Sequence, residues 1–161
     1  MSVEKIDDKL EISFFGEISE DVALEPLSFT GINTVVFDLE GISLLNSCGL
    51  RTWILWIREI PSETVKKFKN CPRIVVEQMN ILEGFLPKNS VIESFYIPYY
   101  CDDCDKEYNK LALEGEDFVA GSMDSNMGVA LSEIPVCKEC GEEMELDVVP
   151  LSYFKFLKKR C

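Results

Sequence analysis

The chain has 161 residues, of which 47% are hydrophobic and 28% charged, a composition that is typical of a folded protein and excludes a disordered one. Its length suits one ordinary domain or two small ones. The formal net charge of -13 argues against a nucleic-acid partner, because phosphate backbones are bound by basic surfaces. The lysines of residues 66–69 are expected on a solvated strand edge, and the basic residues 158–160 at a helix end.

Two absences narrow the function classes further. No apolar run approaches the roughly 20 residues that span a bilayer, and the N-terminus lacks the basic and then apolar order of a signal peptide. These features predict a cytoplasmic protein without a membrane partner. The chain also has no histidine, the most frequent general base and the usual partner of a nucleophilic serine or cysteine. We therefore expect a non-catalytic protein.

Residues 1–98 alternate between predicted strands and helices, which indicates an α/β fold with a mixed, mainly parallel sheet covered by helices. Alternating apolar residues mark half-buried strands, and apolar spacings of three or four mark helices. Gly16 is expected to end the second strand, and the β-branched run at 34–39 predicts a strand that is buried on both faces. The strands are expected at 2–6, 10–15, 34–39, 65–68 and 91–97, and the helices at 21–27, 50–60 and 72–86.

The predicted helix at 50–60 has one apolar face and one exception. Trp53 falls on the apolar face and is expected in the core. Leu55 stands between polar neighbours, so it is either an ordinary exposed leucine or part of a docking surface.

Residues 99–161 differ in composition and predict a second, small β-rich domain. This segment is acidic and carries two Cys-x-x-Cys pairs, separated by a polar stretch at 121–128 that predicts a loop. From Pro150 onward, apolar and then basic residues predict a C-terminal helix whose charge suits the helix dipole.

The two Cys-x-x-Cys pairs predict one metal site. Cys101 and Cys104 form the first pair, and Cys137 and Cys140 form the second, with Gly141 placed to let the backbone turn. Four thiolates at this spacing form a closed tetrahedral shell, which is typical of a structural Zn²⁺ ion in a zinc ribbon.

Other uses of these cysteines stay open at the level of sequence. The 32 residues between the pairs exceed the commonest zinc spacing of roughly 15 to 20, and the polar loop accounts for the excess. Two redox-active dithiols are the main alternative function, and an iron–sulfur cluster is another use of four cysteines. Asp102 and Asp103 disfavour the redox alternative, because negative charge raises the pKa of a neighbouring thiol.

A short motif lies where the strand at 34–39 leads toward the next helix. The strand ends in Asp38-Leu39, and the helix begins with the segment 46–50, Asn-Ser-Cys-Gly-Leu, in which Asn46 or Ser47 suits the N-cap. This run resembles the motif of the STAS domain family, the anti-sigma-factor antagonists and sulfate-transporter tails, in which Asp-Ser-Ser-Gly-Leu starts a helix. The resemblance implies a STAS-like domain over 1–98, followed by the zinc ribbon over 99–161.

The resemblance also implies a regulatory interaction module. In that family a partner kinase phosphorylates the serine before the glycine, a position that is Cys48 here, while Ser47 keeps a hydroxyl. Cys48 is expected to be a small buried residue, with an oxidant-sensing thiol as the alternative. The implied partner is a regulatory protein such as an anti-sigma factor or a histidine-kinase-like ATPase. The expected interaction surface comprises Asn46, Ser47, Cys48, Gly49, Arg51 and Leu55.

Overall fold

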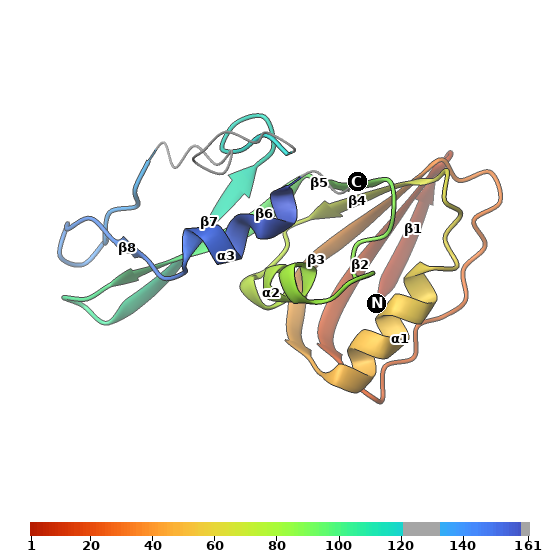
Figure 1. The fold of residues 1–161 in the computed structure, drawn as a ribbon, viewed down its shortest axis with the longest axis horizontal. Coiled ribbons are helices and arrows are strands. Elements are labelled where there is room, and N and C mark those ends of the chain that lie inside the picture. Colours follow the sequence, from red (N-terminus) through yellow and green to blue (C-terminus); the bar gives the residue numbers. More distant parts are fainter. Residues whose placement is uncertain (121–132, 159–161) are drawn as a thin grey trace.

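The computed structural model describes residues 1–120 and 133–158, which contain two β-sheets (Figure 1). In the first sheet, β1 is antiparallel to β2, and β2, β3, β4 and β5 run parallel in that order. A mixed α/β fold, as the sequence predicts, is thereby confirmed. The elements of this half are β1 (Ser2–Ile6), β2 (Lys9–Ile18), β3 (Thr34–Leu45), α1 (Ser47–Ile57), β4 (Val65–Lys69), α2 (Arg73–Ile81) and β5 (Ser90–Ile92).

The helices α1 and α2 lie on one face of the first sheet (Figure 1). The strands turn alternate residues toward them, because side chains of a strand point to opposite faces. Phe14 of β2 and Phe37 of β3 both contact Trp53 edge-on, with ring centroids 5.3 and 5.7 Å away. Trp53 is 1% exposed, so the prediction that it belongs to the core is confirmed.

The opposite face of the first sheet is polar. Lys69 of β4 reaches Glu11 of β2 at 2.5 Å and Asp38 of β3 at 3.3 Å. The expected burial of 34–39 on both faces is therefore wrong: on the polar face only Val36 is buried, and Asp38 is partly exposed. A mixed sheet tolerates this because the ion pairs of one face remain near water.

The ion pair between Glu11 and Lys69 predicts a pH effect. Hydrogen bonds from Lys69 and then Lys9 lower the pKa of Glu11, so its contribution is present above the unfolded pKa and is lost as pH falls through the folded one. We expect Glu11→Gln to lower the free energy of unfolding by about 0.5 to 1 kcal/mol at pH 7, since the pair is partly exposed. The difference should shrink as pH falls through the lowered pKa of Glu11 and vanish once this carboxyl is protonated in the folded and unfolded states alike.

Urea denaturation of both proteins at several pH values measures this difference. Acid would release a bound metal from both proteins alike, so the difference isolates Glu11. Glu4→Gln is the control, because Glu4 lies opposite Glu11 on β1 and makes no ion pair within the described residues. A pH-independent effect of Glu11→Gln would contradict the prediction.

The expected helix at 21–27 is wrong. These residues form an irregular segment that contacts α1: the Trp56 indole donates a hydrogen bond to the Glu25 carbonyl at 2.9 Å. Leu24 and Leu27 pack against the core from this segment. Pro26 disfavours a helix here, and the contacts with α1 hold the segment in another conformation.

Three further expectations of the sequence are wrong in detail. β2 continues past Gly16, whose φ of 80° bends the strand without ending it, as far as Ile18. α2 stops at Ile81 instead of residue 86, because Leu82 adopts extended backbone. Lys66 is not solvated: it is 1% exposed and donates to the Pro61 carbonyl at 2.6 Å.

The expected strand at 91–97 is split between the two sheets. β5 ends the first sheet, and β6 (Ser94–Cys101) is the middle strand of an antiparallel second sheet with β7 (Lys106–Leu113) and β8 (Glu145–Leu146). β6 starts beside the end of β4, where the Tyr96 amide donates to the Cys71 carbonyl at 2.9 Å. The two sheets are therefore joined by backbone hydrogen bonds.

The second sheet is covered by α3 (Pro150–Tyr153) and the short 3₁₀ helix η1 (Phe154–Leu157), which confirms a helical segment from Pro150. Phe156 of η1 contacts Phe95 of β6 edge-on at 5.1 Å, and Phe118, from the segment after β7, contacts it at 5.0 Å. This second ring cluster is continuous with the first core. The loop predicted at 121–128 and the basic residues 159–160 lie outside the described residues.

Candidate functional sites

The turn after β6 and a turn near residue 140 carry the four cysteines predicted to bind a metal. Cys101 is the last residue of β6, and the turn that follows reaches β7 through Asp105, which has a φ of 54°. In the second turn, Gly141 has a φ of 81° and donates its amide to the Cys137 carbonyl at 2.9 Å. The role expected of Gly141 as a turning residue is confirmed.

The four thiols gather in one place. All four Sγ atoms lie within 4.8 Å of one another, and those of Cys101 and Cys140 are 3.5 Å apart. Tetrahedral zinc with Zn–S bonds of about 2.3 Å requires sulfur separations of about 3.8 Å. Cys101 and Cys137 are buried, while Cys140 is exposed. The group is therefore able to hold a metal ion at the C-terminal end of β6.

The surroundings of the thiols favour a thiolate at Cys137 and disfavour one at Cys101 and Cys104. Amide hydrogen bonds from Cys140 and Glu139 lower the pKa of Cys137 to about 7. Hydrogen bonding with Cys140 and burial raise the pKa of Cys104 to about 12. Four thiols this close do not ionise together without a cation, whereas a divalent ion stabilises all four thiolates and releases their protons.

The start of α1 forms the second predicted site. The Gly49 amide donates to the Asn46 side-chain oxygen at 2.9 Å, so the N-cap role of Asn46 is confirmed. Gly49 is buried against β2, where an added Cβ would lie 2.0 Å from the Ile18 carbonyl oxygen. Asn46 also donates to Glu20 at 2.5 Å. These two members of the expected surface thus hold the helix start in place.

Cys48 is exposed, so the expectation that it is a small buried residue is wrong. Cys48 and Gly49 are neighbours in the first turn of α1, and Gly49 faces the sheet while Cys48 faces outward.

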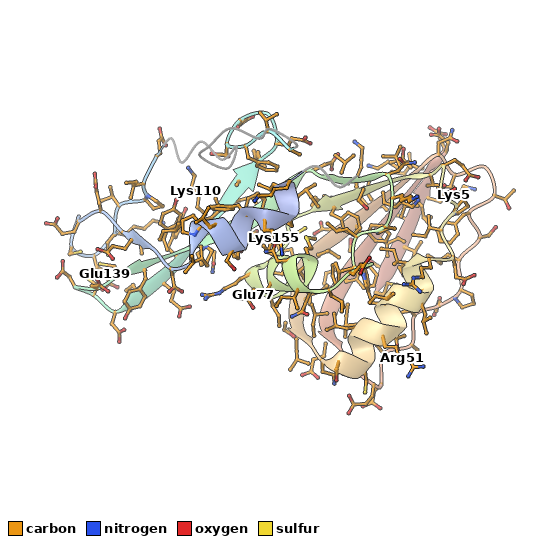
Figure 2. The ribbon with its side chains drawn as sticks, in the orientation of Figure 1. Lys5, Arg51, Glu77, Lys110, Glu139 and Lys155 are labelled. Atoms are coloured by element: carbon orange, nitrogen blue, oxygen red, sulfur yellow. The ribbon has the colours of Figure 1, made fainter. Side chains whose placement is uncertain are left out.

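The remaining members of the expected surface gather on the outer side of α1. Ser47, Arg51 and Leu55 are exposed, and Figure 2 shows Arg51 pointing away from the sheet. They line a hollow of about 330 Å³ between α1 and the segment that follows α2. Leu55 is 55% exposed. The other residues that line this hollow are Leu50, Ile54, Arg58 and Leu82.

Only some of these additional lining residues could be predicted from the sequence. Arg58 follows Arg51 by seven residues, so helical spacing alone places both on one side of α1. Leu82 comes from beyond α2, and no periodicity connects it with α1.

Comparison of the chain with protein-family models, curated proteins and solved structures finds no match. Within residues 1–120 and 133–158, no helix has the length and apolar character that crossing a bilayer requires.

Proposed function

We propose that the chain is a non-catalytic, STAS-like regulatory module that binds a partner protein through the outer side of α1. The observation that carries this proposal is the hollow beside α1, where Arg51 and Leu55 are exposed around apolar side chains. Arginine is enriched at protein interfaces, and the buried centre of an interface is more apolar than the rest of a protein surface. The partner expected is a regulatory protein such as an anti-sigma factor or a histidine-kinase-like ATPase.

We further propose that the metal is Zn²⁺ and that its role is structural. Four cysteine sulfurs fill the coordination shell of zinc and leave no position for water or substrate. Such an ion ties the end of β6 to the turn at 137–141 and stabilises the second sheet.

A double substitution tests the docking surface. Arg51→Glu with Leu55→Asp should lower capture of a specific partner from native lysate by about thirty-fold, because it removes an apolar anchor and reverses a charge beside it. The measurement is quantitative mass spectrometry of proteins retained by immobilised wild-type and variant chains.

The matched control is Lys5→Glu with Ile6→Asp on β1, at the end of the first sheet opposite to the start of α1. Ile6 is 50% exposed, comparable with Leu55, and Figure 2 shows Lys5 at a different part of the molecule from Arg51. Equal capture by wild type and by a folded Arg51/Leu55 variant would remove the proposed surface.

A further inference from the structure

A second hollow adjoins the one beside α1. It measures about 360 Å³, lies between the end of α2 and η1, and shares Leu82 with the first hollow. Ile81 and Phe156 also line it. We refer to the two hollows together as the helical groove, which receives side chains from α1, α2 and η1.

The floor and rim of the helical groove contain exposed apolar side chains. Leu55 of the first hollow is 55% exposed, and Ile81 of the second is 78% exposed. Leu82 lies between them and is half-buried. Each exposed side chain would lose water contacts when a partner covers it, and burying a leucine or isoleucine fully contributes about 1.5 to 3 kcal/mol.

The charge of the helical groove is opposite to that of the chain. The whole sequence has 16 basic and 29 acidic residues. Within the groove lining, four charged residues are basic and one, Glu83, is acidic. Figure 2 shows Arg51 on the outer side of α1 and Lys155 beside α2. The basic residues of the groove are Arg51, Arg58, Lys155 and Lys158.

These four basic side chains are available to a partner. All are exposed, and none makes an ion pair within the part of the chain that the structure describes. By contrast, Lys67, Lys69 and Lys110 are each paired with a carboxylate. The groove thus presents unpaired positive charge beside exposed apolar surface.

We propose that the helical groove binds an acidic amphipathic helix of the partner protein, an inference that rests on the proposed function and adds the chemistry of the partner. Apolar residues spaced at i, i+3 or i+4, and i+7 would cover Leu55, Leu82 and Ile81. Carboxylates on the flanks of that helix would face the four basic residues. A helix fits because the groove lies between helical elements. An extended peptide would instead pair with an edge strand of a sheet, and the edge strands of the first sheet, β1 and β5, do not line the groove.

The negative charge of the rest of the chain directs an acidic partner helix toward the groove. An acidic helix is repelled by a protein of net charge -13 except where basic side chains gather. Complementary charge therefore directs the partner to the groove and raises the association rate at low salt. The groove also includes Lys155 and Phe156 of η1, so both halves of the chain contribute to one binding surface.

A displayed library of random 16-residue peptides tests the inference without knowledge of the partner. Selection on the wild-type chain, with counter-selection on the Arg51→Glu, Leu55→Asp variant, should enrich peptides with Asp or Glu flanking apolar residues at helical spacing. Enrichment of neutral or basic peptides would overturn the inference and leave the docking surface intact. No difference between the two baits would overturn the docking surface as well.

A second experiment measures how much affinity comes from the basic residues that the inference adds to the proposed docking surface. The variant Arg58→Gln, Lys155→Gln, Lys158→Gln should weaken binding of the most enriched peptide about tenfold, because three partly screened charges are lost. The control variant Lys5→Gln, Lys9→Gln, Lys67→Gln has the same net charge, changes lysines on strands of the first sheet that line neither hollow, and should bind as wild type does. Fluorescence anisotropy gives both affinities, and circular dichroism of the whole chain confirms folding. Equal weakening in the two variants would overturn the inference.

Discussion

Removal of the metal is expected to unfold the second sheet while the first sheet keeps its packed core. Structural zinc contributes on the order of 10 kcal/mol to small modules of this kind, and an ion held by the four cysteines would tie β6 to the turn at 137–141. The first sheet has its own helices and ring cluster. Both tryptophans of the chain, Trp53 and Trp56, lie in that cluster, so their fluorescence reports on the first sheet alone.

The measurement combines native mass spectrometry with thiol titration. We expect one zinc per chain, and four thiols that react only after a chelator is added. Cys48 is exposed and should react at once, whereas burial raises the pKa of Cys71 and should delay its reaction until unfolding. Hydrogen exchange over β6 and β7 should rise on chelation while tryptophan fluorescence changes little.

Cys48→Ser is the control for loss of a thiol, and it should bind the metal as wild type does. Cys137→Ser should lose the metal, because its sulfur belongs to the group of four. A chain that holds no metal, or that forms two reversible disulfides among these cysteines, would contradict the structural role. That outcome would favour the redox alternative instead.

Truncation of Phe37 should cause the largest loss of stability among single apolar substitutions in the first sheet. Phe37 is 0% exposed and stacks on Phe68 with ring centroids 4.9 Å apart, while Trp53 and Trp56 contact it edge-on. Phe37→Ala removes these contacts and leaves a cavity, so we expect a loss of about 3 to 5 kcal/mol.

Phe15→Ala is the matched control, because Phe15 lies on the neighbouring strand and is 65% exposed. Its effect should stay within about 0.5 kcal/mol. Guanidinium denaturation followed by tryptophan fluorescence gives both values. Similar losses for the two variants would mean that the ring cluster does not carry the stability of the first sheet.

Local patterns predicted the elements whose residues repeat with one period. The alternation of Leu10, Ile12 and Phe14 indicated β2, because a half-buried strand buries every second residue. The helical spacing of Trp53 and Ile57 indicated α1 in the same way. The four cysteines were predictable as one group because a metal constrains their spacing along the chain.

Other features depend on contacts between distant segments. The residues of 21–27 have a weak helical pattern, but the Trp56 indole binds the Glu25 carbonyl instead. Lys66 reads as solvated, yet Pro61 and Ser62 provide carbonyls that accept from its ammonium group. The helical groove needs Leu82 beside α1, a neighbourhood that only the folded chain creates.

β6 combines two duties on one side of a single strand. Phe95, Ile97, Tyr99 and Cys101 are all 2% exposed or less and alternate along it. Because side chains change faces at every residue, one inserted or deleted residue would turn the rings outward and move the metal ligand away at once. Insertions or deletions between Phe95 and Cys101 are therefore tolerable only two residues at a time. The position of the cysteine ligand thus depends on the same alternation that buries the aromatic rings.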